Sequence, residues 1–179
     1  MDEAKVQLHF TISLDGFIAG PDHELDWLAG LTEEPDVVAE AAAACGAIIT
    51  GRRGFDAMPA EFRAGDMPYD GGFAGRVFVL THHPEDVRPD PTVTFLNCDV
   101  ADAIATASKV AGGRNVEIFS ADISQQCLER GLVDEIYLHL APVILGKGIR
   151  LFDNVGRSDW ALITDGDPLR LPRLRFRPR

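Results

Sequence analysis

The chain has 179 residues, 46% of them hydrophobic, which is enough for one hydrophobic core and too little for two ordinary domains. Its 28 acidic and 17 basic residues give a net charge of −11, which argues against general binding to nucleic acid or to an anionic membrane, because both need dense positive charge. We therefore expect one soluble domain over residues 1–179.

The sequence carries no obvious membrane or export signal. It has no apolar run near the roughly 18 residues that span a bilayer. Its start, Met1-Asp2-Glu3, lacks the basic residues of a signal peptide. A cytoplasmic location is the expectation. The three cysteines lack metal-ligand spacing and are expected to be buried or free thiols.

The first half of the chain predicts strands separated by one helix. Apolar and polar residues alternate from Val6 to Leu14, which is typical of a strand that ends at Asp15-Gly16. Residues 17–31 are predicted to form a loop and a short turn. Thr32 is then predicted to cap a helix that presents one apolar face, including Cys45, and closes at Gly46.

Buried strands and two further helices are predicted downstream. Asp99 and Ser120 can each cap a helix, the first ending at Gly112-Gly113 and the second at Gly131. Four short, almost uniformly apolar segments are typical of buried strands: Ala47–Thr50, Val77–Leu80, Val93–Leu96 and Val116–Phe119. Residues 57–76, between two of these strands, are rich in Gly and Pro. A loop that long is usually functional, so we interpret it as a flap over a site.

The last third predicts one more strand, a turn and a hairpin. Alternation from Ile136 to Ala141 predicts a strand that Pro142 ends, and residues 145–148 supply two glycines for a sharp turn, after which Leu151 and Phe152 return to a core. Residues 160–176 are predicted to form a hairpin around Asp165-Gly166-Asp167, with a bulge near Pro172. The whole pattern predicts a mixed α/β domain with a mostly parallel sheet, helices on both faces and an antiparallel C-terminal hairpin.

Three predicted strand ends bring polar or glycine-containing turns to what should be one edge of the sheet. In open α/β sheets, ligands bind beyond the carboxyl ends of strands, and helix N-termini there offer N–H groups to phosphate. Gly51 would let the backbone approach a phosphate, and Arg52 or Arg53 could pair with it. The alternative is a solvated turn with two surface arginines. The turns are Thr50-Gly51-Arg52-Arg53, Thr81-His82-His83 and Ser120-Ala121-Asp122-Ile123.

The order of these motifs resembles a known family. Ser13-Leu14-Asp15-Gly16, Gly51-Arg52-Arg53, Val79-Leu80-Thr81 and the stretch from Gly131 to Phe152 follow the order found in the reductase domain of bacterial riboflavin-pathway deaminase/reductase proteins. That domain belongs to the dihydrofolate reductase-like superfamily. The resemblance implies the dihydrofolate reductase-like fold, NADPH as cofactor and a small heterocyclic substrate of the pyrimidine or pterin type.

The resemblance also implies roles for individual residues. The turns that contain Thr50 to Arg53, Thr81-His82 and Ser120 to Ile123 would hold NADPH, with Gly51-Arg52 beside its adenosine phosphates. Asp15 is the first candidate for the proton-donating carboxyl and Asp26 the second, with Glu24 close by in the sequence.

The chain departs from the family at two places. Gly54 stands where Thr or Ser is common, and Ser120-Ala121 stands where the family has two glycines. These departures favour the alternative, a non-catalytic dimeric ligand-binding protein with a degenerate cofactor site.

Two further expectations concern metals and assembly. The histidines His23, His82 and His83 lack partners at metal-ligand spacing, so no metal site is expected. Tyr137, His139 and Ala141 lie opposite the apolar face of their strand and are less polar than a solvent face should be. With the turn up to Ile149, they predict an exposed apolar patch and a homodimer whose interface includes part of Tyr137 to Ile149. The alternative is that this face is ordinary core.

Overall fold

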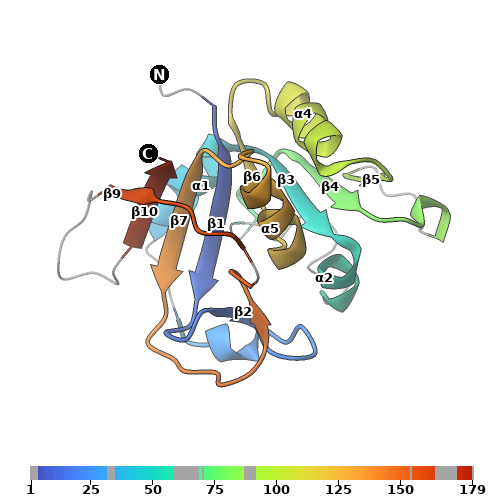
Figure 1. Ribbon diagram of the computed structural model, residues 1–179. Coiled ribbons are helices and arrows are strands. Elements are labelled where there is room, and N and C mark those ends of the chain that lie inside the picture. The colour runs from blue at the N-terminus through green and yellow to red at the C-terminus, as the bar shows by residue number, and fades with distance from the viewer. Residues whose placement is uncertain are drawn as a thin grey trace.

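The computed structural model describes residues 4–31, 35–58, 69, 71–86, 92–153, 155–163 and 173–178. Within them, one sheet has the strand order β5-β4-β3-β6-β1-β7-β10-β9 (Figure 1). The strands, in chain order, are β1 (Val6–Ile12), β3 (Cys45–Gly51), β4 (Arg76–Leu80), β5 (Val93–Leu96), β6 (Asn115–Ile118), β7 (Glu135–Leu140), β9 (Trp160–Ile163) and β10 (Arg173–Pro178).

The sheet is parallel from β5 to β7 and antiparallel beyond it. The pairs from β5 through β4, β3, β6 and β1 to β7 are parallel, whereas β10 pairs antiparallel with both β7 and β9. The predicted mixed sheet and its antiparallel C-terminal pair are therefore confirmed. The turn at residues 165–167 and the bulge near Pro172 lie outside the described residues, as does most of the predicted flap at 57–76.

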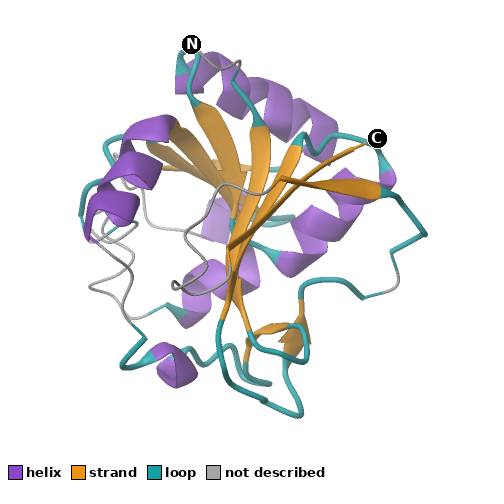
Figure 2. Ribbon diagram, turned by 90° about the vertical axis from the view of Figure 1, so that its left-hand side faces the viewer, coloured by secondary structure: helices purple, strands orange, loops and turns teal. Residues whose placement is uncertain are grey.

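Helices cover both faces of this sheet (Figure 2). On one face lie α4 (Val100–Ala111) and α5 (Ala121–Glu129), and α1 (Pro35–Ala44) lies on the other. The short helix α2 (Arg52–Ala57) follows β3, and 3₁₀ turns form at Asp26–Leu28 and Pro84–Asp86. Asp99 caps α4 by accepting a hydrogen bond from the Ala101 N–H at 2.9 Å, and Gly112 ends it with a left-handed φ of 63°. Both features of α4 are as predicted.

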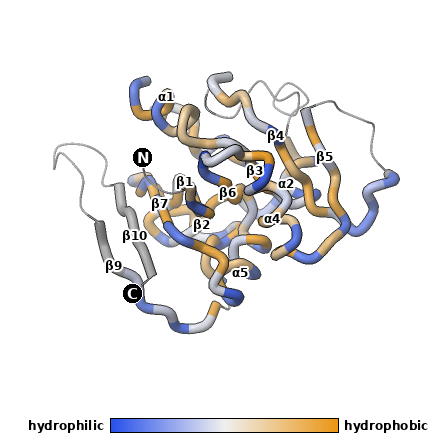
Figure 3. The backbone as a smooth tube through the Cα atoms, turned by 90° about the horizontal axis from the view of Figure 1, so that it is seen from above, coloured by the Kyte–Doolittle hydropathy of each residue, from blue (hydrophilic) through white to orange (hydrophobic). Residues whose placement is uncertain are grey.

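Alternating strand residues build two hydrophobic clusters, one on each face. Ala47 and Ile49 of β3 pack in the larger cluster with α4 and α5, whereas Ile48 packs in the smaller one on the opposite face. Hydrophobic segments concentrate in these inner strands and hydrophilic ones in the peripheral turns (Figure 3). No helix among the described residues is long and apolar enough to cross a membrane.

The predicted end of the first helix is wrong. The helix ends at Ala44, and both Cys45 and Gly46 belong to β3. A Cβ at Gly46 would lie 2.5 Å from the Ala111 carbonyl oxygen, so glycine is needed here because α4 packs directly on the strand. Thr32, the predicted cap, lies outside the described residues.

A second, two-stranded sheet was not predicted. β2 (Phe17–Ala19) lies within the segment expected to be loop, and it pairs antiparallel with β8 (Ile149–Arg150). The paired residues are about 130 positions apart in the sequence. The local pattern of apolar and polar residues therefore could not predict this pairing. After β8, Leu151 is fully buried as predicted, but Phe152 is 39% exposed, so its predicted return to the core is wrong.

Candidate functional site at the carboxyl edge of the sheet

The turns after β3 and β6 lie side by side at the carboxyl edge of the parallel sheet. The Thr50 hydroxyl donates a hydrogen bond to the Phe119 carbonyl at 2.9 Å, and the Phe119 N–H donates to the Ile49 carbonyl at 2.8 Å. Both bonds cross between the two chain segments. They fix Gly51 next to Ser120, as the parallel order of the strands requires.

Ser120 has a defined place in this edge. Its hydroxyl oxygen accepts a hydrogen bond from the Ile123 N–H at 3.5 Å and caps α5. A Cβ built on Gly51 would lie 3.0 Å from the same oxygen, so glycine at 51 makes room for the serine side chain. Ala121 is 9% exposed, and Ile123 is 2% exposed. Of the two residues that stand where the resemblance implies a glycine pair, Ser120 therefore packs against Gly51, and Ala121 is buried.

The predicted turn Thr50-Gly51-Arg52-Arg53 is in fact the end of β3 followed directly by the first residues of α2. Its two arginines have different surroundings. Arg52 donates from Nε to the Asp56 carboxylate at 2.6 Å and from a terminal nitrogen to the His83 carbonyl at 3.4 Å. Arg53 is exposed. Through Arg52, the turn after β4 adjoins the turn after β3.

The turn after β4 is held by two hydrogen bonds of Thr81, one within the turn and one to β5. The Thr81 hydroxyl oxygen accepts from the His83 N–H at 3.1 Å, and the Thr81 N–H donates to the Leu96 carbonyl at 2.9 Å. The side chain of His82 is exposed. In the first turn of α5, Asp122 is also exposed and accepts from the Gln126 amide at 2.8 Å. All three predicted turns therefore meet at one edge, with a guanidinium, hydroxyls and the N-terminus of α5 available to an anion.

Asp15 lies at the carboxyl end of β1 and is held by hydrogen-bond donors. Its carboxylate accepts from the Ser13 hydroxyl at 2.6 Å and from the N–H groups of Leu145 and Gly146 at 3.1 and 2.8 Å. The Ser13 hydrogen bond first, and the two backbone N–H groups after it, lower the pKa of Asp15 from 3.8 to about 2. Asp15 is therefore ionised at neutral pH and is suited to accept hydrogen bonds, not to donate a proton.

The other two candidate acids are exposed. Asp26 begins the 3₁₀ turn Asp26–Leu28, and the Glu24 carboxylate accepts from the Asp22 N–H at 2.7 Å. Immediately after Asp26, the indole N–H of Trp27 is buried without a hydrogen-bond partner among the described residues. Within the described part of the chain, no hydrogen bond or ion pair joins Asp26 to Asp15 or to the segment that contains Gly51.

The face of β7 that was expected to be an exposed patch lies inside the protein. His139 is 5% exposed and Ala141 1%, and Tyr137 is partly buried. The prediction of an exposed patch is wrong for this face, because His139 and Ala141 are buried beside polar side chains of the neighbouring strands. His139 is hydrogen-bonded to His9 of β1, and His9 contacts Glu117 of β6. Sequence reasoning missed this cluster, although a His, a Glu and a second His at inward positions of three predicted strands were a signal for it.

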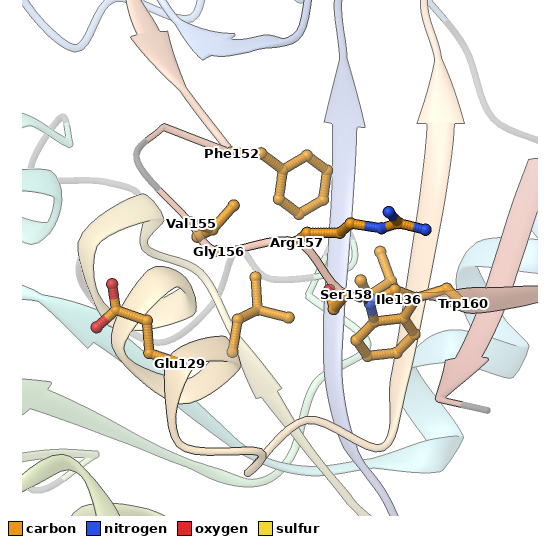
Figure 4. A pocket seen from close by; sticks show the side chains of 9 residues that line it. Glu129, Ile136, Phe152, Val155, Gly156, Arg157, Ser158 and Trp160 are labelled. Atoms are coloured by element: carbon orange, nitrogen blue, oxygen red, sulfur yellow. Dashed lines mark hydrogen bonds between the residues drawn. The ribbon is translucent and has the colours of Figure 1, made fainter.

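A cavity of about 530 Å³ lies apart from the carboxyl edge (Figure 4). It lies between the end of α5, β7 and the segment that leads to β9, with Leu128, Ile136, Val155 and Trp160 in its wall. It contains none of the residues predicted for the cofactor or for catalysis. Within the part of the chain that the structure describes, no group of three or more His, Cys, Asp or Glu side chains could hold a metal ion.

Comparison with known proteins gives the family. The model of the RibD C-terminal domain matches residues 4–175, which is nearly the whole chain. The chain belongs to the RibD C-terminal domain family. It is 30% identical over 152 residues to the uncharacterized protein YwjB of Bacillus subtilis (strain 168), covering 84% of this chain and 83% of YwjB.

Solved structures with the same fold include riboflavin-pathway and folate reductases. The diaminohydroxyphosphoribosylaminopyrimidine deaminase/5-amino-6-(5-phosphoribosylamino)uracil reductase of Thermotoga maritima superimposes with a TM-score of 0.69 at 16% identity, covering 99% of this chain and 57% of that one. Dihydrofolate reductase of Enterococcus faecalis, complexed with NADP(H) and RAB-propyl, gives a TM-score of 0.62 at 17% identity, covering 96% and 93%. These likenesses establish a dihydrofolate reductase-like fold for a member of the RibD C-terminal domain family.

Proposed function

We propose that this RibD C-terminal domain protein is an NADPH-dependent reductase of the pyrimidine or pterin type. The observation that carries the proposal is the meeting of the three turns after β3, β4 and β6 at one carboxyl edge of the sheet. Membership of the RibD C-terminal domain family supports a reductase of this kind, and the E. faecalis dihydrofolate reductase with the same fold is complexed with NADP(H). The substrate is a small heterocycle, and the expected location is the cytoplasm.

The residues at this edge fit the phosphates of such a cofactor. Ser120 uses its oxygen to cap α5, so its hydroxyl hydrogen stays available as a donor. The first N–H groups of α5 favour an anion, and the exposed guanidinium of Arg53 can pair with one. When bound, NADPH would supply the hydride, and this edge would hold its phosphates.

A non-catalytic dimeric ligand-binding protein on the same fold is the second candidate. Arg52 favours it, because its Nε is already paired with Asp56 and its terminal nitrogen with a backbone carbonyl. Asp15 favours it as well, because an ionised carboxylate with three donors does not supply a proton. This candidate, whose cofactor site is degenerate, predicts that a ligand binds and is not turned over. The reductase requires bound NADPH, so NADPH binding is the first property to measure.

Titration of the purified protein with NADPH tests the proposal. Replacing both arginines, Arg52→Ala and Arg53→Ala, should weaken binding by about 1–3 kcal/mol, or roughly 5- to 150-fold in Kd, the range for a lost charged hydrogen bond. Arg157→Ala is the matched control, because Arg157 is 89% exposed and pairs with Asp159 away from this edge. Absence of NADPH binding to the unmodified protein at millimolar cofactor would exclude the reductase.

A further inference from the structure

The cavity at the end of α5, here called the α5 cavity, is a second place where a small molecule fits. Its volume of about 530 Å³ lies within the range of about 300 to 1,000 Å³ that is usual for small-molecule sites. Ser120 caps the other end of α5, and the nine residues of that helix extend over roughly 13 Å, at about 1.5 Å per residue. A ligand in the α5 cavity is therefore separate from the carboxyl edge where the phosphates of NADPH are proposed to bind.

The floor of the α5 cavity belongs to the hydrophobic core. Ile136 is 5% exposed and is a member of the larger core cluster, and Leu128 and Trp160 pack against that cluster. Side chains in a close-packed core have little room to move aside. The cavity is therefore preformed on this side and does not need a ligand to give it its shape.

The two aromatic residues of the wall are fixed at both ends of one segment (Figure 4). Phe152 follows Leu151, which is fully buried and whose carbonyl accepts a hydrogen bond from the Gln125 amide of α5 at 3.4 Å. Trp160 is the first residue of β9, and its indole N–H donates to the Ser158 hydroxyl at 2.9 Å. Phe152 and Trp160 are thus held in place on either side of the opening.

Both rings are open to a further aromatic group. Among the described side chains, neither Phe152 nor Trp160 contacts another aromatic ring. Phe152 is also 39% exposed, so part of its apolar surface meets water. Aromatic rings gain from offset or edge-to-face contact with another ring, and covering apolar surface is favourable in itself. A planar aromatic molecule supplies both contributions.

The charge at the opening of the cavity favours an anion. The Arg157 side chain is 89% exposed, and its guanidinium lies 3.6 Å from the Asp159 carboxylate, which is 66% exposed. An ion pair this exposed is weak, so the guanidinium can exchange Asp159 for a ligand. The Ser158 oxygen accepts from Trp160, which leaves the Ser158 hydroxyl hydrogen to donate. Glu129, the other charged residue of the wall, directs its carboxylate away from the two rings (Figure 4).

We propose that the α5 cavity is a binding site for a planar aromatic anion, such as an aromatic carboxylate. The ring system of the ligand lies between Phe152 and Trp160 over the aliphatic floor, and its carboxylate pairs with Arg157 at the opening. This site goes beyond the proposed reductase activity and does not depend on it.

Fluorine NMR of protein labelled with 5-fluorotryptophan tests the site, with 1-naphthoate as the probe. The chain has two tryptophans, so Trp27→Phe assigns both signals. We expect 1-naphthoate to shift the Trp160 signal saturably and to leave the Trp27 signal in place, because only Trp160 lies in the wall of the α5 cavity. The absence of a saturable shift of the Trp160 signal at millimolar 1-naphthoate would overturn the proposal.

Filling the cavity tests its location. Gly156 lines the cavity, and a Cβ there meets nothing within 4 Å, so Gly156→Leu places a side chain in the open space without a clash. This variant should unfold at the same temperature as the unmodified protein and should lose the Trp160 shift. A Gly156→Leu protein that binds 1-naphthoate as tightly as the unmodified protein would show that the ligand lies elsewhere.

A charge comparison tests the ligand class and does not depend on the filled variant. Arg157→Gln should weaken 1-naphthoate binding about two- to fivefold, the range for an exposed ion pair, and should leave binding of the neutral 1-naphthalenemethanol unchanged. Lys109→Gln is the matched control, because it removes an exposed cation from α4. Equal affinities for 1-naphthoate, 1-naphthalenemethanol and the cationic 1-naphthalenemethylamine would overturn the assignment of an anion.

Discussion

At the scale of single residues, Asp15 places an ionised carboxylate at the carboxyl edge of the sheet. The two oxygens of Asp15 receive three donors, and Arg150 donates to the Asp15 carbonyl at 2.7 Å while its guanidinium lies 4.2 Å from the centre of the Phe17 ring. The carboxylate thereby joins the end of β1 to the turn at Leu145-Gly146. Asp15 therefore has a structural function, which is to fix that turn, besides any function of its charge in the site.

The lowered pKa of Asp15 predicts a pH dependence of stability. Because the folded-state pKa is about 2 against an ordinary 3.8, its stabilising contribution is complete above about pH 4 and is lost as the pH falls toward 2. Asp15→Asn should therefore be less stable than the unmodified protein at pH 7 and should lose less stability between pH 4 and 2. Urea unfolding across this range measures both effects. The exposed Asp26→Asn is the control, and equal acid sensitivity of the unmodified and Asp15→Asn proteins would contradict the prediction.

Gly54 is a second residue with a testable consequence. A Cβ there would lie 3.9 Å from the Thr50 hydroxyl oxygen, which is ordinary contact, so a larger side chain fits. Gly54→Thr supplies the hydroxyl that the resemblance implies at this position and should tighten NADPH binding more than NADH binding. Calorimetry with both cofactors decides this, and Gly54→Ala separates the hydroxyl from the gain in helix propensity. Equal changes for the two cofactors would show that the hydroxyl does not reach the 2′-phosphate.

At the scale of elements, the position of α4 depends on one glycine of β3. A Cβ at Gly46 would lie 2.7 Å from the Ala111 Cα and 2.5 Å from its carbonyl oxygen, both of them backbone atoms that side-chain rotation cannot move away. The helix must then shift against a close-packed core.

Gly46→Ala should therefore destabilise the protein by about 1–3 kcal/mol, the usual range for overpacking. The midpoint of thermal or urea unfolding measures the loss. Gly156→Ala is the matched control, because a Cβ there meets nothing within 4 Å. A Gly46→Ala protein as stable as this control would mean that α4 is free to move away from β3.

At the scale of the whole molecule, a homodimer remains a prediction with a changed basis. The buried His139 and Ala141 do not form an exposed patch, so the face of β7 no longer supports it. Ile144 is 73% exposed and Leu14 55%, and the Leu14 N–H donates to the Val143 carbonyl at 2.8 Å, which places the two segments side by side. Exposed apolar side chains that gather in this way usually mark an interface.

Light scattering at micromolar concentration tests the dimer. We expect about twice the 19.5 kDa mass of one chain, and a shift toward one chain in Ile144→Glu. Val110→Glu is the control, because Val110 is 48% exposed on α4. A mass near 19.5 kDa for the unmodified protein would end this prediction.

The sequence by itself determined the main elements and the edge at which they meet. The alternation in β1 and β7, the apolar runs of β3, β4, β5 and β6, and the caps at Asp99 and Ser120 are local signals that depend on residues a few positions apart. Because the predicted strands are parallel, their carboxyl ends meet, and the turns that contain Gly51, Thr81 and Ser120 were predicted together without a structure.

Only the tertiary structure decided what those residues contact. The three donors around Asp15 include two from residues about 130 positions away, and His9 and His139 are separated by 130 residues in the sequence. The pairing of β2 with β8, the close approach of α4 to Gly46 and the burial of the face around His139 likewise depend on packing between distant segments. Periodicity reports which face a side chain occupies, but whether that face meets water or another polar side chain is determined by the neighbouring strands and the segments that cover them.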